Sequence, residues 1–188
     1  MTESIRRILV LTAWSVSAAP VVLLALLVAV AKPQTSTAVD YSQATVAGLH
    51  YQVVSDRPIR ASNPVDAHLV AGLPVAERHA GAGQRLLGVF VTVANESPRP
   101  LRTAARIDLR DEAMHVYHPL RLPAGNPYAY QPTRLAPGGE LPGAGTPPAD
   151  NLAANGMLLL YRVPAFEYQN GTFELTVHDA GAIRTVGL

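Results

Sequence analysis

The stretch RLLGVFVTVA, residues Arg85–Ala94, decides the fold class of this chain. It is apolar at almost every position and rich in β-branched residues, which is typical of a strand buried on both faces inside a β-sheet structure. The run Asn95-Glu96-Ser97-Pro98 follows directly and predicts a turn that ends the strand. A strand of this kind needs partner strands, and the remaining sequence is expected to supply them.

Two segments on either side alternate between apolar and polar residues and predict half-buried strands. They are Leu49–Val53 (LHYQV) and Thr172–His178 (TFELTVH). Their inward residues are expected to be Leu49, Tyr51, Val53, Phe173, Leu175 and Val177. The dipeptide Asn170-Gly171 before the second segment favours a type I′ hairpin.

Further strands are predicted with weaker patterns, at Ala67–Glu77, Met114–His118, Tyr128–Leu135 and Gly156–Val163. The spacing of apolar residues in Arg102–Leu109 permits a strand or a helix, and the neighbouring strands favour a strand. Seven or eight short strands separated by Gly, Pro and Asn turns predict an all-β, antiparallel β-sandwich.

An uncharged stretch of twenty-four residues, Ile8–Ala31, precedes the strands. A helix needs about 20 apolar residues to cross a bilayer, so this stretch predicts one N-terminal transmembrane helix. Arg6 and Arg7 precede it and only Lys32 follows, which places the N-terminus in the cytoplasm. The expected organisation is a cytoplasmic segment (1–7), a transmembrane helix (8–31), a flexible linker (32–47) and an extracytoplasmic domain (48–188).

A cleaved secretory signal is the alternative, because Ala29-Val30-Ala31 has the small-x-small form of a processing site. The apolar region exceeds the core of a typical signal, which favours a retained anchor. Either alternative exports the domain from the cytoplasm.

Composition excludes several classes of function. The chain contains no cysteine, which excludes disulfides, thiolate metal sites, a cysteine nucleophile and an N-terminal lipid-modified cysteine. The formal net charge is +1, and no long basic tail points to nucleic acid. Lys32 is the only lysine beside many arginines, which we interpret as the codon bias of a GC-rich bacterial genome.

Three runs resemble a known family: Leu87–Ser97 (LGVFVTVANES), Ile107–Asp111 (IDLRD) with Tyr117, and Leu159–Pro164 (LLYRVP). They are similar to the immunoglobulin-like extracytoplasmic domains of unknown function on actinobacterial and other Gram-positive membrane proteins and lipoproteins. The resemblance covers roughly residues 48–179 and implies a fold and a location, with no catalytic residue to carry over. This chain departs from the common layout in its hydrophobic anchor and in a long insert, residues 137–156.

Partner contacts are expected at loops and at a basic face. The insert Pro137–Gly156 is longer than most loops without secondary structure, which are usually functional when they exceed about 12–15 residues. Tyrosine is favoured at interfaces, and the C-terminal half of the chain is rich in it, with Tyr117, Tyr128, Tyr130, Tyr161 and Tyr168. The candidate partner-binding residues are Tyr128, Tyr130, Arg102, Arg106 and Arg110, with the three arginines on one face if their strand is continuous.

Chemical signatures are sparse. His115-x-x-His118 beside Met114 suggests copper, but residues three apart in a strand point to opposite faces. The sequence lacks a Gly-x-Ser-x-Gly elbow, a His-Glu-x-x-His helix, a phosphate-binding glycine loop and a paired-carboxylate site. We therefore expect no enzyme and no cofactor, but a membrane-anchored binding module for a protein partner. The alternatives are a structural subunit of a larger membrane complex and an extracytoplasmic copper carrier.

Overall fold

The computed structural model describes residues 42–151, 155–179 and 182–188. The predicted cytoplasmic segment, the predicted transmembrane helix (8–31) and most of the predicted linker lie outside these residues. Within the described ranges, none of the helices has the length and apolar character needed to span a bilayer.

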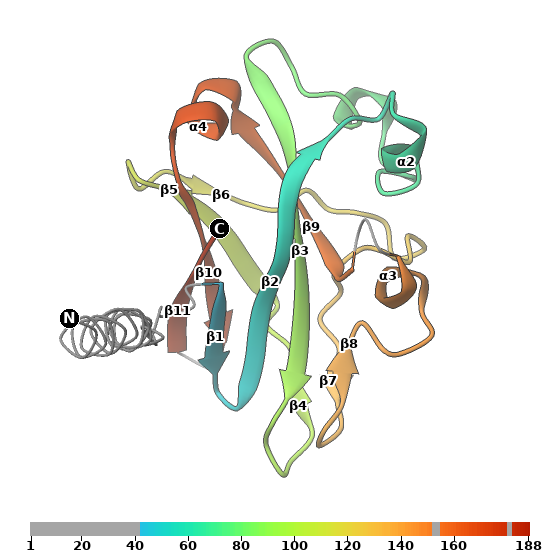
Figure 1. The fold of residues 1–188 in the computed structure, drawn as a ribbon, viewed down its shortest axis with the longest axis vertical. Helices are drawn as coiled ribbons and strands as arrows, with labels where there is room; N and C mark the ends of the chain where they lie inside the picture. The colour runs from blue at the N-terminus through green and yellow to red at the C-terminus, as the bar shows by residue number, and fades with distance from the viewer. Residues whose placement is uncertain (1–41, 152–154, 180–181) are drawn as a thin grey trace, which may run out of the picture. The chain divides into compact units, whose positions relative to one another are not determined.

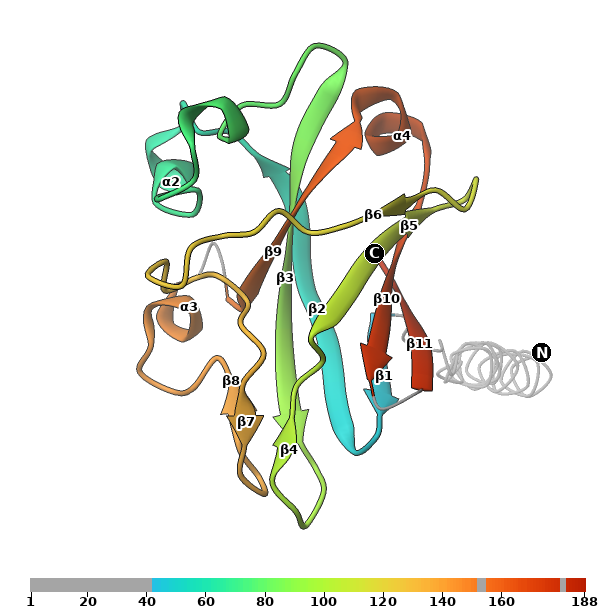
Figure 2. The ribbon, with the colours of Figure 1, turned by 180° about the vertical axis from the view of Figure 1, so that it is seen from behind.

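Antiparallel strands are the main regular secondary structure of the described chain, and its helices are short, so the predicted all-β class is confirmed (Figures 1 and 2). The five-stranded sheet has the order β1 (Gln43–Val46), β2 (Leu49–Ile59), β3 (Gln84–Asn95), β8 (Glu140–Leu141), with β9 (Met157–Pro164) also paired to β3. The four-stranded sheet has the order β11 (Ala182–Gly187), β10 (Phe173–Asp179), β5 (Arg106–Asp111), β6 (Val116–Tyr117). A two-stranded sheet joins β4 (Leu101–Arg102) to β7 (Arg134–Leu135).

Strand β3 lies between β2 and β9 and is buried on both faces. Its alternating side chains enter two different hydrophobic cores. Val89 and Val91 face the main core, which β2 and β9 share with β5 and β10 of the other sheet. Phe90 faces a smaller core with Leu69 and Leu73. This double burial explains why the sequence of β3 is apolar at nearly every position.

The predicted inward faces of β2 and β10 are confirmed. Leu49, Tyr51 and Val53 are buried on β2, and Phe173, Leu175 and Val177 are buried on β10. The strand predicted at Gly156–Val163 is also confirmed, as β9.

The strand predicted at Ala67–Glu77 is wrong, because this region forms α2 (Pro64–Ala67) and a 3-10 turn, η1 (Val75–Glu77). The side chain of Asn63 accepts a hydrogen bond from the Val65 N–H at 3.0 Å and caps the first turn of α2. Pro64 follows at the first helical position, where its missing N–H costs no hydrogen bond.

The strand predicted at Arg102–Leu109 is interrupted, since β4 ends at Arg102 and β5 begins at Arg106. Two tyrosines from distant parts of the chain bind the backbone at the interruption. The N–H of Ala104 donates to the Tyr51 hydroxyl at 2.7 Å, and the Tyr130 hydroxyl donates to the Ala104 carbonyl at 2.9 Å. These side chains take the place of a strand partner at Ala104.

Several predicted boundaries need correction. The predicted linker 32–47 contains β1, because Ala47 and Gly48 both have positive φ and close a hairpin that pairs β1 with β2. The strands predicted at Met114–His118 and Tyr128–Leu135 are shorter in the structure, where they are β6 and β7.

Two predicted loop features also differ. The dipeptide Asn170-Gly171 lies at the end of the helix α4 (Ala165–Asn170) and does not form a hairpin turn. The insert 137–156 contains the strand β8 and the helix α3 (Pro147–Asp150).

Candidate binding groove

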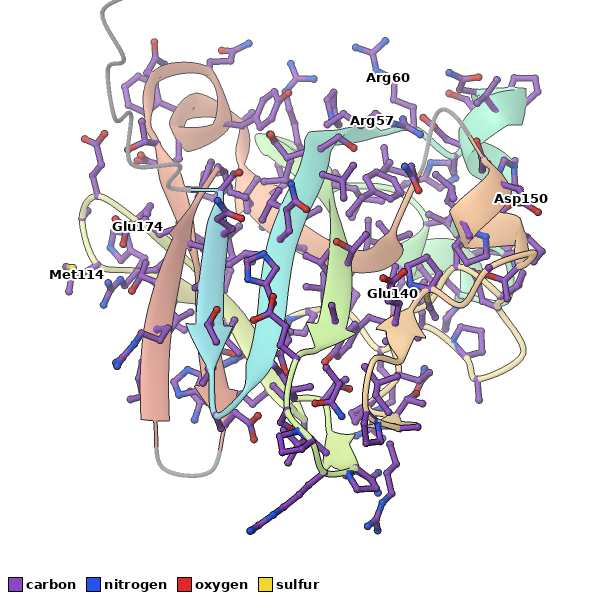
Figure 3. The ribbon with its side chains drawn as sticks, turned by 60° about the horizontal axis from the view of Figure 1, so that its bottom comes forward. Arg57, Arg60, Met114, Glu140, Asp150 and Glu174 are labelled. Atoms are coloured by element: carbon purple, nitrogen blue, oxygen red, sulfur yellow. The ribbon has the colours of Figure 1, made fainter. Side chains whose placement is uncertain are left out.

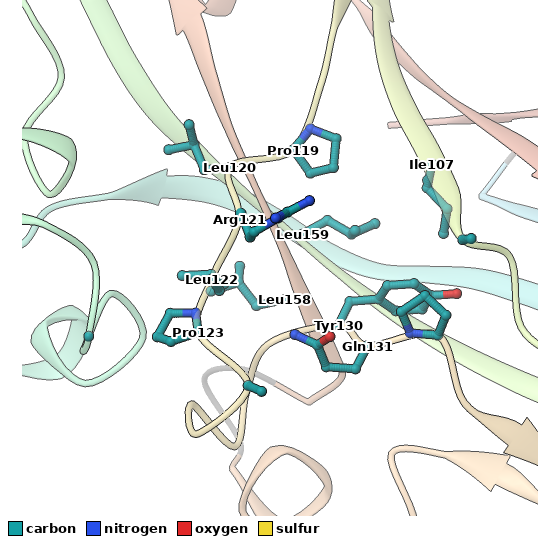
Figure 4. Close-up of a pocket in the computed structure, with 14 residues that line it drawn as sticks. Ile107, Pro119, Leu120, Arg121, Leu122, Pro123, Tyr130, Gln131, Leu158 and Leu159 are labelled. Atoms are coloured by element: carbon teal, nitrogen blue, oxygen red, sulfur yellow. The ribbon is translucent and has the colours of Figure 1, made fainter.

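A groove of about 660 Å³ opens beside β9, on the side away from β3 (Figure 4). Its walls are the extended segment 119–124, the segment 130–132, the start of β5 and the first residues of β9. The lining residues are Gly72, Ala105, Ile107, Pro119, Leu120, Arg121, Leu122, Pro123, Ala124, Tyr130, Gln131, Pro132, Leu158 and Leu159.

Backbone hydrogen bonds fix the two segments that form the walls. The Leu120 N–H donates to the Leu160 carbonyl at 2.7 Å, which attaches the 119–124 segment to β9. The Leu158 N–H donates to the Tyr128 carbonyl at 2.7 Å, and the Tyr130 N–H donates to the Leu158 carbonyl at 3.0 Å. Proline at both 119 and 123 restricts φ and disfavours a helix between them.

The surface of the groove is partly apolar and partly polar, and it includes one arginine. Arg121 is exposed and points over Leu159 in Figure 4, and no described residue forms an ion pair or hydrogen bond with its guanidinium group. Gln131 adds an exposed amide at the opposite wall. The volume of the groove falls within the roughly 300–1,000 Å³ of ligand sites, although its surface is more polar than the mostly apolar walls of a small-molecule pocket.

The two predicted tyrosines have different environments. Tyr130 lines the groove, but its hydroxyl is engaged with Ala104, and burial raises the pKa of Tyr130 well above its ordinary value. Tyr128 lies outside the groove lining, with its ring 4.9 Å from the ring of His68 and its hydroxyl 3.4 Å from the Asn151 amide nitrogen. The ring of Tyr130 is therefore the part of this side chain that can contact a ligand in the groove. Tyr128 packs against the segments that contain His68 and Asn151.

The three predicted arginines do not form one face of a continuous strand. Arg102 belongs to the two-stranded sheet, whereas Arg106 and Arg110 belong to β5. Arg106 contacts Asp108 at 2.6 Å and Arg110 contacts Glu174 at 3.2 Å, so local acids neutralise both. Partner binding by these three arginines stays a prediction.

Asp108, on β5 of the four-stranded sheet, is a buried carboxylate at the centre of a polar cluster. Its oxygens lie 2.6 Å from Arg106 Nε, 2.7 Å from His118 Nδ1 and 3.1 Å from His178 Nε2. Burial by itself would raise the pKa of the Asp108 carboxyl, but the hydrogen bonds and charges of His118 and Arg106 outweigh burial and lower it. No local sequence pattern reveals that His118, after β6, and His178, on β10, contact this carboxylate.

Asp111 forms a second cluster, which separates the two histidines of the predicted copper site. Its carboxylate lies 2.9 Å from His115 Nδ1 and accepts a hydrogen bond from the Tyr117 hydroxyl at 2.8 Å. His115 and His118 thus bind different carboxylates. Across the described part of the chain, no three His, Asp or Glu side chains are arranged to hold a metal ion.

The sequence alone did not identify the groove. Its walls come from several parts of the chain, from Gly72 to Leu159, and among its lining residues Tyr130 was a candidate partner-binding residue. The one local signal was the pair of prolines that frame the Leu120–Leu122 stretch.

Comparisons with known proteins give a fold similarity. The chain resembles the crystal structure of a putative lipoprotein from Bacillus subtilis, with a TM-score of 0.50 and 11% sequence identity over 78% of this chain. That match spans 38% of the lipoprotein. A conserved hypothetical protein from Bacillus anthracis gives a TM-score of 0.47 at 11% identity, over 77% of this chain and 91% of that one. No protein-family model and no curated protein sequence matches the chain.

Proposed function

We propose that this chain is a membrane-anchored extracytoplasmic module that binds a partner protein in the groove beside β9. The observation that carries the proposal is the unpaired guanidinium of Arg121 in a groove whose surface is partly polar and partly apolar. Water hydrates this guanidinium group in the free protein, and an anion on a ligand would match its charge and fix the orientation of the ligand.

The occupant we propose is an exposed segment of the partner that carries an Asp or Glu side chain beside an apolar one. The guanidinium group of Arg121 can form two parallel hydrogen bonds with a carboxylate, which fixes orientation as well as charge. The apolar neighbour would then contact Leu122 and Leu159 and lose its exposure to water.

The domain is proposed to be an immunoglobulin-like sandwich. The order β2-β3-β9 in one sheet and β11-β10-β5 in the other corresponds to the A-B-E and G-F-C strands of that fold. The shared core of the two sheets supports the same assignment.

The proposed location is the outer face of the cytoplasmic membrane. The uncharged stretch Ile8–Ala31 and the excess of arginine before it support a retained anchor with the domain outside. The fold similarity to a protein named as a putative lipoprotein is compatible with this location.

Photo-crosslinking in native membranes tests the groove. A photoreactive amino acid in place of Gln131 in the full chain is expected to yield one discrete crosslinked product. Arg121→Glu should abolish this product, because it replaces the proposed partner of a carboxylate with a like charge. Arg184→Glu is the matched control, since Arg184 is exposed on β11 outside the groove. Equal loss of product in both variants would overturn the proposal.

The principal alternative is a structural subunit whose anchor helix makes the specific contacts. Replacing residues 8–31 with an unrelated membrane span distinguishes the two. The groove proposal expects the crosslinked product to persist after the exchange, and its loss would favour the subunit. The copper-carrier alternative lacks support from the described residues, because His115 and His118 bind separate carboxylates.

A further inference from the structure

A pair of side chains joins two of the segments that form the groove. Ile107, at the start of β5, and Pro119, at the start of the 119–124 segment, both line the groove (Figure 4). Asp108 directly follows Ile107, and His118 directly precedes Pro119. Nδ1 of His118 lies 2.7 Å from a carboxylate oxygen of Asp108. This contact therefore connects β5 to the segment that carries Arg121.

Asp108 is a suitable anchor for His118. Its carboxylate is buried, and Arg106 and His178 contact it from β5 and β10. An ionised carboxylate only accepts hydrogen bonds, so Nδ1 of His118 is the donor. The side chain of His118 is 67% exposed. Burial therefore contributes little to the placement of this ring, and the hydrogen bond to Asp108 fixes it.

Residues 119–122 make few polar contacts of their own. In the part of the chain that the structure describes, their one hydrogen bond runs from the Leu120 N–H to the Leu160 carbonyl at 2.7 Å. The side chains of Leu120 and Leu122 pack into the smaller core beside β9. These contacts attach the segment to the five-stranded sheet. The contact of His118 with Asp108 attaches it to the four-stranded sheet.

The far end of the segment is held separately. A Cβ atom at Gly72 would overlap the ring of Pro123, so these two residues are in close contact. The Asn126 N–H donates to the Pro123 carbonyl at 2.9 Å, and the Asn126 side chain donates to the Leu69 carbonyl at 2.8 Å. Because Pro123 is held in this way, loss of the contact at His118 is expected to release the near end of the segment, where Arg121 lies.

We propose that the His118–Asp108 pair is a positioning element of the groove, which sets the separation between β5 and the segment that carries Arg121. This inference rests on the proposed function, because the occupant is the same acidic and apolar segment of a partner protein. Paired hydrogen bonds from a guanidinium group to a carboxylate require a defined orientation. The apolar neighbour must contact Leu159 at the same time. Loss of the pair therefore weakens binding although neither residue touches the partner.

Amide hydrogen exchange of the full chain, purified in a neutral detergent, tests the positioning without a partner. His118→Leu removes the hydrogen bond, and exchange in the 119–124 segment is expected to accelerate about tenfold, as the loss of one hydrogen bond to a charged group implies. His118→Asn is the rescue variant, because the amide nitrogen of Asn can take the place of Nδ1 and donate to the same carboxylate. It should exchange like the wild type.

His115→Leu is the matched control. His115 follows Met114, which lies exposed at the tip of the connection between β5 and β6 (Figure 3). Its Nδ1 contacts Asp111 at 2.9 Å, and its side chain is also 67% exposed. His115 precedes β6, whereas the 119–124 segment follows β6, so this variant should leave exchange in the segment unchanged. Equal acceleration in His115→Leu and His118→Leu, or none in His118→Leu, would overturn the proposal.

Photo-crosslinking from position 131 in native membranes tests the consequence for binding. His118→Leu should lose most of the crosslinked product, whereas His118→Asn and His115→Leu should retain it. Faster exchange in His118→Leu with an unchanged yield of product would contradict this inference alone and leave the proposed function standing. If the chain with native His118 gives no product, the proposed function fails and the role of the pair in binding fails with it.

Discussion

Asp108 shows how single residues hold the four-stranded sheet together. A buried carboxylate is costly unless hydrogen bonds and opposite charges compensate it. Arg106, His118 and His178 provide that compensation from β5, from the chain after β6 and from β10. One side chain therefore connects three segments of the sheet at its outer face.

We predict that Asp108→Asn lowers the free energy of unfolding by about 2 kcal/mol at pH 7, because charge-assisted hydrogen bonds are lost. The pKa of Asp108 is lower in the folded chain than in the unfolded chain. Its stabilising effect is therefore present above about pH 4 and disappears as the pH falls through the folded pKa. Chemical denaturation at pH 7 and at pH 3 measures both values.

The difference between wild type and Asp108→Asn is thus expected to shrink at pH 3. Asp150→Asn serves as the control, because Asp150 is exposed and its loss should change stability by less than about 0.5 kcal/mol. A difference for Asp108→Asn that is the same at both pH values would show that its charge is unimportant.

At the scale of elements, strands with regular patterns were predictable and the segments that join them were not. β2, β3, β9 and β10 have sequence patterns set by burial, and the alternation or apolar run identified them. The interruption between β4 and β5 depends on Tyr51 and Tyr130, which lie 53 and 26 residues from Ala104. No local pattern carries that information. The start of α2, in contrast, could have been predicted from the local sequence, because Asn63-Pro64 is a typical helix N-cap followed by a proline at the first helical position.

The packing of β3 against its neighbours gives a prediction at this scale. A Cβ atom at Gly88 would lie 2.8 Å from Ile59 Cγ1 and 3.0 Å from Leu158 Cδ1. Gly88→Ala should therefore lower the free energy of unfolding by roughly 1–3 kcal/mol, as overpacking of a core does. Denaturant unfolding measures the change.

Gly125→Ala is the matched control, because nothing lies within 4 Å of a Cβ atom at that position. We expect it to leave stability nearly unchanged. Ile59→Val added to Gly88→Ala should recover part of the loss, because it removes a methyl group from the crowded contact. Full stability of Gly88→Ala alone would mean that β2 and β9 move apart at little cost.

At the scale of the whole molecule, the candidate groove results from segments that meet only after folding. The groove combines parts of β5, β9 and the long connection between β6 and β7. The sequence favoured Arg102, Arg106 and Arg110, which lie close together in the chain, whereas the structure pairs Arg106 and Arg110 with acids and places Arg121 in the groove.

The orientation of the full chain can be tested because it contains no cysteine. A single introduced cysteine then reports the side of the membrane on which it lies. Ser4→Cys marks the predicted cytoplasmic segment, and Val65→Cys marks an exposed position on α2. A membrane-impermeant maleimide added to intact cells should label Val65→Cys, whereas Ser4→Cys should react only after the cells are permeabilised.

The size of the labelled species distinguishes the two alternatives for residues 8–31. A retained anchor predicts that the species carrying the Ser4 label and the species carrying the Val65 label have the same mass. Cleavage after Ala31 predicts a shorter species that carries only the Val65 label. Labelling of Ser4→Cys but not Val65→Cys on intact cells would reverse the orientation, place the groove in the cytoplasm, and require a cytoplasmic partner in place of an extracytoplasmic one.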